Sequence, residues 1–166
     1  AIALPRTGSL SPAPNWEKET RLQGDMNMLN FGIVGACGRG SSFRTACEAL
    51  GNVCIKAICD INEDELQAAA QRLGAEKTFT CYEDMLAGET LDAVIIGTPM
   101  QLHVPMAIPA LERGISVLSE VTAGVSIDEC RDLVQACKTS SGVYMMAENY
   151  AYMRPNAIVR EIVRSG

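Results

Sequence analysis

Features that would point to a membrane, a metal or a disulfide framework are scarce in this sequence. No apolar run approaches the roughly 20 residues that span a bilayer. His103 is the single histidine, so a zinc site lacks a supporting ligand pattern. The seven cysteines are odd in number, and none are spaced Cys-x-x-Cys. We therefore expect no metal and no disulfide, with the cysteines serving as small core residues in a reducing, cytoplasmic compartment.

Positive charge is also in short supply. The chain has 14 lysines and arginines against 20 acidic residues, which gives a net charge of −6 and a pI of about 4.8. This balance argues against nucleic acid or an anionic membrane surface as a partner. Hydrophobic residues make up 48% of the 166 residues, which is enough for the core of one domain.

The N-terminal segment 1–27 differs in character from the rest. It carries Pro5, Pro12 and Pro14, scattered charge and no apolar periodicity. It also lacks the apolar region of a secretory signal. We expect residues 1–27 to be a disordered leader outside the fold.

From residue 29 onward, apolar runs alternate with amphipathic stretches that carry helix signals. Asn62 and Ser126 are each followed three residues later by a glutamate, as in a capping box, and Gly51 and Gly74 stand where helices should end. This alternation predicts an α/β fold, a doubly wound parallel sheet of the Rossmann type. Strands are expected at 29–34, 53–59, 78–80, 91–96, 115–118 and 143–146, and helices at 40–50, 82–87, 102–113 and 155–164 and after the two caps.

The segment 31–40 reads Phe-Gly-Ile-Val-Gly-Ala-Cys-Gly-Arg-Gly, a strand that enters a glycine turn and then a helix. Gly35, Cys37 and Gly40 occupy the three positions of the dinucleotide fingerprint Gly-x-Gly-x-x-Gly. Cys37 replaces the middle glycine, and the neighbouring Gly38 can take over part of its role. The pattern predicts a pyrophosphate site, and the alternative is a tight strand-to-helix turn without a ligand. The Cys37 thiol is either a reactive group with a lowered pKa at a helix N-terminus or a small residue tolerated near the phosphates.

Asp60 follows Gly40 by 20 residues and ends the second apolar strand. A carboxylate there accepts hydrogen bonds from the adenosine ribose and repels a 2′-phosphate, so NAD is favoured over NADP. Arg44 and Asn62 lie close enough in sequence to leave NADP open. The alternative for Asp60 is an acid that simply caps the next helix.

Ligands of doubly wound sheets bind beyond the carboxyl ends of the strands, where several candidate residues fall. These are Gly35, Ala36, Cys37, Gly38, Arg39, Gly40, Asp60, Ile61, Gly97, Thr98, Pro99 and Glu120.

Five segments together resemble the N-terminal half of the Gfo/Idh/MocA oxidoreductases. They are Gly-Ile-Val-Gly-Ala-Cys-Gly-Arg-Gly at 32–40, Ala-Ile-Cys-Asp at 57–60, Gly-Thr-Pro-Met-Gln-Leu-His at 97–103, Ile-Ser-Val-Leu-Ser-Glu at 115–120 and Met-Ala-Glu-Asn-Tyr at 146–150. The resemblance implies a nicotinamide dinucleotide as ligand and a sugar or polyol as substrate of the intact protein. It also implies that residues 28–150 form the dinucleotide-binding domain, and that 151–166 is a helix leading to a second domain this chain does not include.

Three of the candidate residues have a plainer alternative. Glu120 is similar to a family glutamate at the nicotinamide, or is a solvated turn acid. Asn149 is similar to a family position near the pocket and can bond the carboxamide or the backbone. His103 is a pocket residue, or a hydrogen-bonded histidine near a helix end, which we favour.

One departure from the family pattern affects the chemistry. The family sequence Glu-Lys-Pro reads Glu120-Val121-Thr122 here, and its lysine is often given a catalytic role. Valine can neither polarise a carbonyl nor move a proton. No catalytic residue is therefore assigned. The readings left open are a domain of a sugar or polyol oxidoreductase, a nucleotide-binding module without catalysis, and part of a glycosidase that uses tightly held NAD. An exposed contact surface for a second domain would favour self-association into a homo-oligomer.

Overall fold

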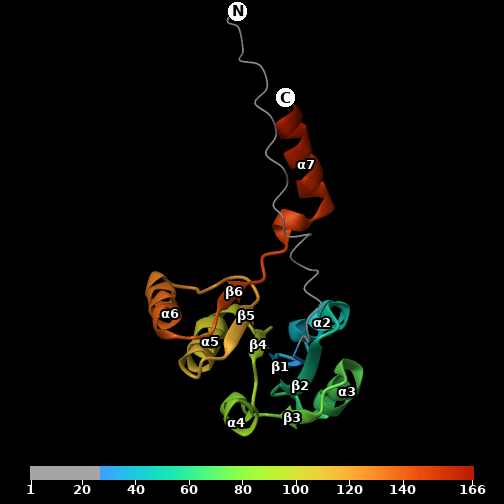
Figure 1. Cartoon of the computed structure of the whole chain (residues 1–166), viewed down its shortest axis with the longest axis vertical. Helices are drawn as coiled ribbons and strands as arrows, with labels where there is room; N and C mark the ends of the chain where they lie inside the picture. Colours follow the sequence, from blue (N-terminus) through green and yellow to red (C-terminus); the bar gives the residue numbers. More distant parts are fainter. Residues whose placement is uncertain (1–26) are drawn as a thin grey trace, which may run out of the picture.

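The computed structural model describes residues 27–166, so the predicted leader lies outside the described residues except for Asn27. Six parallel strands form one sheet in the order β3-β2-β1-β4-β5-β6 (Figure 1). This order reverses direction between β1 and β4, which confirms the doubly wound fold. The strands are β1 (Leu29–Val34), β2 (Val53–Cys59), β3 (Lys77–Phe79), β4 (Ala93–Ile96), β5 (Ser116–Ser119) and β6 (Tyr144–Met146).

Helices cover both faces of the sheet. Cys47 of α2 and Leu66 of α3 pack in one apolar cluster, and Met85 of α4, Leu111 of α5 and Leu133 of α6 pack in the other. The α-helices are α2 (Arg44–Leu50), α3 (Glu63–Leu73), α4 (Tyr82–Gly88), α5 (His103–Glu112), α6 (Ile127–Thr139) and α7 (Arg154–Ser165), with 3-10 turns η1 (Arg39–Phe43), η2 (Met100–Leu102) and η3 (Tyr150–Tyr152).

Strand β2 contains an irregularity that affects the direction of its side chains. Phe31 of β1 pairs with Ile55, but the next residue, Gly32, pairs with Ala57, so Lys56 is an extra residue in β2. Ile55 and Ile58 therefore pack in the same cluster, on the α2–α3 side, although they are three residues apart. Such a bulge changes which face every following side chain meets.

Both predicted N-caps are present, but neither forms the reciprocal capping box. Asn62 accepts a hydrogen bond from the Glu65 N–H at 3.4 Å, and Ser126 accepts one from the Glu129 N–H at 3.2 Å. The Glu129 carboxylate accepts from the N–H of Val125 at 2.8 Å, one residue before the cap. A side-chain oxygen thus accepts from a backbone N–H at the start of each helix. The Glu129 carboxylate bonds one residue before the cap, and the Glu65 carboxylate makes no capping bond within residues 27–166.

Two local expectations were wrong in detail. The helix predicted from Gly40 begins as the 3-10 turn η1 and becomes α-helical only at Arg44. Only Cys47 and Cys59 are buried among the seven free cysteines, and the other five are half-buried.

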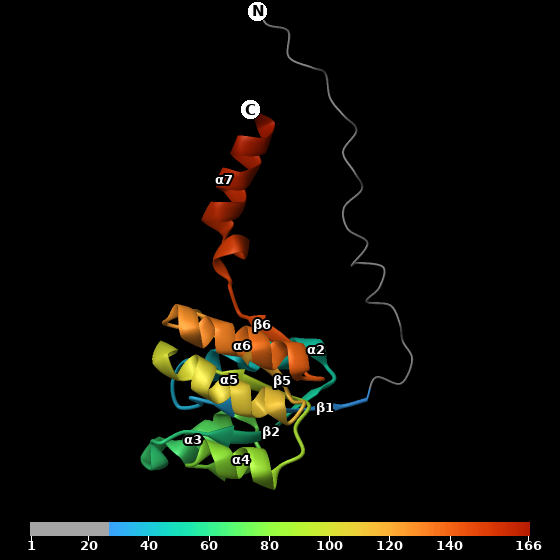
Figure 2. The same ribbon diagram turned by 90° about the vertical axis from the view of Figure 1, so that its left-hand side faces the viewer.

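Helix α7 stands away from the sheet and its covering helices in both views (Figures 1 and 2). Its apolar side chains Ile158, Val159, Ile162 and Val163 are all exposed. The helix begins at Arg154, one residue before the predicted start, with Met153 as its N-cap and Pro155 in its first turn. Within residues 27–166, no helix combines the length and apolar character needed to cross a membrane.

Candidate dinucleotide site

A cavity of about 520 Å³ lies at the carboxyl ends of the central strands. Its walls come from the glycine turn after β1, the residues after β2 and β3, and the loop after β4 that leads into α5. Nine of the predicted residues line it: Gly35, Cys37, Gly38, Arg39, Asp60, Ile61, Gly97, Thr98 and Pro99. The cavity therefore lies beyond the carboxyl ends of the strands, where ligands of doubly wound sheets bind and where the sequence motifs fall.

The glycine turn is built by close approach of two backbones. Gly35 has φ of +76°, and a Cβ on it would lie 2.5 Å from the Gly97 oxygen. A Cβ on Gly97 would lie 2.4 Å from the Gly40 nitrogen. The turn after β1 and the loop after β4 thus touch without intervening side chains, and the cavity opens beside this contact.

Most N–H groups of the turn are already bonded, and one is not. Gly38 and Gly40 both donate to the Gly35 oxygen, at 3.2 Å and 3.0 Å. Within residues 27–166, the N–H of Arg39 has no hydrogen-bond partner. Arg39 also lines the cavity, and its side chain brings a positive charge to this part of the site.

Asp60 is held by two backbone donors. The Cys37 N–H donates to its Oδ2 at 2.8 Å, and the Asn62 N–H donates to its Oδ1 at 3.0 Å. Asn62, not Asp60, caps α3. The carboxylate is thereby oriented beside the cavity, and each oxygen keeps a lone pair for a further donor such as a ribose hydroxyl.

The Cys37 thiol also lines the cavity, with its Sγ 3.8 Å from the Asn62 oxygen. Its pKa is raised above the ordinary value, first by partial burial and then by the negative charge of Asp60. The structure thus contradicts a lowered pKa at a helix N-terminus. The plainer prediction, a small residue at the edge of the site, agrees with this geometry.

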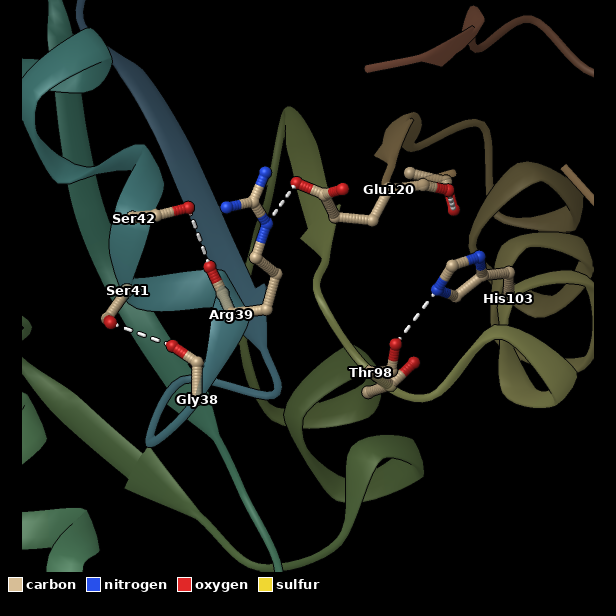
Figure 3. A network of polar contacts seen from close by, with 8 residues as sticks. Gly38, Arg39, Ser41, Ser42, Thr98, His103 and Glu120 are labelled. Carbon is tan, nitrogen blue, oxygen red and sulfur yellow. Dashed lines mark hydrogen bonds and ion pairs between the residues drawn. The ribbon is translucent and has the colours of Figure 1, made fainter. Parts of the chain in front are cut away.

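Arg39 and Glu120 form an ion pair that joins the glycine turn to the end of β5 (Figure 3). The Arg39 Nε lies 2.7 Å from the Glu120 Oε1, and the two side chains are 54% and 9% exposed. Glu120 is therefore a buried, paired carboxylate and not a solvated turn acid. It reaches the cavity only through Arg39, because Glu120 itself does not line it.

The remaining predicted residues stand apart from the cavity wall. Ala36 is buried in the core, and Gly40 is buried against Gly35 and Ile33. His103 is buried, with both ring nitrogens next to backbone oxygens. Asn149 is exposed just before η3, outside the cavity.

Several cavity residues were missed by the sequence reasoning. Thr80 and Tyr82 follow β3, and Leu102 and Met106 come from η2 and α5. The Tyr82 hydroxyl donates to the Met106 oxygen at 3.0 Å, which joins these two walls. The only sequence signal for Thr80 was its place at the carboxyl end of a strand. Met106 lies at an apolar position of α5, and such a position predicts core packing rather than a place in a cavity wall.

The comparisons with known proteins agree with this architecture. Residues 29–148 match the family model GFO_IDH_MocA, described as the oxidoreductase family with an NAD-binding Rossmann fold. The chain belongs to this family. It supplies the family's NAD-binding Rossmann domain, which confirms the resemblance, the fold class and the ligand class inferred above.

Curated relatives of the chain are sugar-acting enzymes by name. It is 33% identical over 153 residues to a glycosyl hydrolase family 109 protein of Shewanella pealeana, covering 85% of this chain and 33% of that protein. It is 29% identical over 169 residues to an alpha-N-acetylgalactosaminidase of Shewanella oneidensis, covering 95% of this chain and 37% of that protein. The chain therefore spans little more than a third of these relatives' length.

Two solved structures with the same fold are dehydrogenases by name. The myo-inositol 2-dehydrogenase of Lactobacillus plantarum superposes with a TM-score of 0.75 at 26% identity, over 83% of this chain and 41% of that one. The WlbA dehydrogenase of Bordetella pertussis, solved with NADH and UDP-GlcNAcA, gives a TM-score of 0.74 at 28% identity, over 85% and 43%.

Proposed function

We propose that the chain binds NAD(H) in the cavity beside the glycine turn, and we assign residues of the site to the ribose, the pyrophosphate and the nicotinamide. Asp60 accepts hydrogen bonds from the adenosine ribose. The Arg39 N–H and guanidinium hold the pyrophosphate, where Gly35 and Gly38 leave room for it. Thr98 and Pro99 border the path toward the nicotinamide. The observation that carries the proposal is that Asp60, oriented by two backbone donors, and Arg39, whose N–H has no partner within residues 27–166, line the same cavity.

The residues present fit a dinucleotide by their own chemistry. A pyrophosphate needs donors and a close backbone approach, and Gly35 and Gly97 leave no Cβ between the two loops. Ile61 is 91% exposed beside Asp60, and Leu102 and Met106 add apolar wall, which suits an aromatic base. Arg44 pairs with Glu48 at 2.7 Å on the helix surface and does not line the cavity, so it gives NADP no support.

A nicotinamide supplies hydride exchange with a substrate when it is bound. In this chain, the position of the family lysine holds Val121, which is 39% exposed and has no titratable group. The described residues thus orient a dinucleotide and tie Glu120 to Arg39.

For the intact protein, we propose action on a sugar or polyol and favour a glycosidase with retained NAD over a dehydrogenase. Two observations support this order. Val121 removes the lysine to which the dehydrogenase chemistry is often assigned, and the curated relatives are named as glycosyl hydrolases. The fold alone, shared with inositol and UDP-sugar dehydrogenases, supports either activity. The free thiols fit the cytoplasm as the expected compartment.

Titration of the 166-residue chain with NADH and NADPH, followed by ligand fluorescence, tests the binding proposal. We expect saturable NADH binding and weaker NADPH binding. Absence of binding to folded protein would contradict the site. For the parent protein, NAD that co-purifies, together with glycoside cleavage and no net NADH, would support the glycosidase. Steady NADH production from a polyol would instead favour the dehydrogenase.

A further inference from the structure

His103, the first residue of α5, lies between two loops and touches the backbone of both. The residue is 1% exposed. The Nδ1 atom lies 2.6 Å from the Thr122 oxygen and the Nε2 atom 2.9 Å from the Thr98 oxygen. Figure 3 shows the ring pointing from α5 toward Thr98. Because one ring nitrogen faces each loop, the imidazole bridges them.

These two loops form the end of the site opposite Asp60. Thr98 follows β4 and lines the cavity, whereas Thr122 follows Glu120 and Val121 after β5. The last backbone bond between them is from the Glu120 N–H to the Ile96 oxygen at 2.9 Å. Beyond it, within residues 27–166, the polar contacts that link these loops run through the His103 ring.

Both partners of the ring are carbonyl oxygens, which only accept hydrogen bonds. A neutral imidazole carries one N–H, so the ring can donate to one of these two oxygens while its other nitrogen lies beside the second. Removing the ring would leave the bonded oxygen without its donor. An unpaired buried carbonyl is costly, so the loops would shift toward water or another donor. The spacing between the loops therefore depends on this one side chain.

We propose that His103 is a positioning residue that fixes the loops after β4 and β5 and so sets affinity for the nicotinamide half of the dinucleotide. It acts through Thr98 and the Glu120–Thr122 segment, because the buried ring does not line the cavity. This rests on the proposed function, in which the adenosine half binds at Asp60. A general packing role would instead affect both halves of the ligand equally.

The test compares NADH with ADP-ribose, which lacks the nicotinamide. In His103→Leu, which removes both ring nitrogens, we expect NADH affinity to fall about tenfold and ADP-ribose affinity to stay within about twofold. His103→Gln, whose amide can donate to one carbonyl, should recover part of the loss. Arg113→Gln removes a side-chain bond to the Pro109 oxygen at the other end of α5 and serves as the matched control. Equal losses for both ligands, or no loss, would overturn the proposal.

Hydrogen exchange without ligand separates this proposal from the proposed function. We expect faster exchange in His103→Leu at residues 97–102 and 120–126, with unchanged rates in β1 and β2. Unchanged exchange at both loops would overturn the positioning role even if the wild type binds NADH. If the wild type binds no NADH, the function fails while the exchange result still decides the role of His103. Should the leucine variant not fold, His103→Gln is compared in the same way.

Discussion

The Arg39 guanidinium donates through Nε to the Glu120 carboxylate at 2.7 Å, so the glycine turn and the end of β5 are tied by one ion pair. Arg39 lines the cavity, while Glu120 is buried. Arg39 thus ties the two segments together and, in the proposed function, also contacts the pyrophosphate.

Arg39→Met should therefore change two measurable quantities. We expect NADH affinity to fall about tenfold, because a charge-assisted contact to the pyrophosphate is lost. The free energy of unfolding should fall by about 1 kcal/mol, because Glu120 loses its partner. The double variant Arg39→Met/Glu120→Gln should recover stability but not affinity. Recovery of both in the double variant would contradict a direct role of Arg39 in binding.

Gly35→Ala should be severely destabilising, because its backbone has φ of +76° and the added Cβ would lie 2.5 Å from the Gly97 oxygen. Gly51→Ala is the matched control, with φ of +71° and nothing within 4 Å of the added carbon. We expect the control to cost about 1 kcal/mol and Gly35→Ala to cost clearly more. Urea unfolding measures both, and equal costs would show that the contact with Gly97 is not tight.

Cys37 should react slowly with iodoacetamide at neutral pH, although its thiol lines a cavity. Burial and the nearby Asp60 charge raise its pKa, so less of the reactive thiolate is present at a given pH. Asp60→Asn removes the negative charge, which lowers the pKa and should speed alkylation. Peptide mass spectrometry follows Cys37 separately from the other six cysteines. Faster alkylation in the wild type than in the variant would contradict this electrostatic effect.

Asp60→Asn should also narrow the preference for NADH over NADPH. The amide still offers an oxygen to the ribose but no longer repels a 2′-phosphate. We expect NADPH affinity to rise relative to NADH by about tenfold, the size of one close charge contact. Glu65→Gln, at the cavity edge on α3, is the control and should leave the ratio nearer the wild-type value. An unchanged ratio in Asp60→Asn would place the adenosine ribose elsewhere.

The exposed apolar side of α7 predicts self-association at high protein concentration. Ile158, Val159, Ile162 and Val163 face solvent on one helix that stands away from the sheet. Ile162→Lys should shift the protein toward monomer in sedimentation velocity. Glu161→Gln raises the net charge by the same one unit without removing an apolar group, and should leave the self-association unchanged. A monomeric wild type at high concentration would disprove the prediction.

Local sequence signals were sufficient to predict the strands, the helix caps and the glycine turn. Asn62 and Ser126 cap helices as predicted because capping is decided within four residues. The far wall of the cavity was missed because Tyr82 and Met106 meet only after the sheet has assembled. For the same reason the Arg39–Glu120 pair, 81 residues apart in sequence, left no local pattern to read.

The bulge at Lys56 changes the direction of the side chains that follow it in β2, between the core and the ligand site. Ile55 and Ile58 face α2 and α3, and Cys59 faces the opposite layer, only because one residue is skipped in pairing. A deletion at Lys56 would shorten the chain by a single residue while exchanging the two faces for one half of β2. Its consequence would be a change of direction for Asp60, so that an acid with unaltered chemistry would point away from the cavity that it now borders.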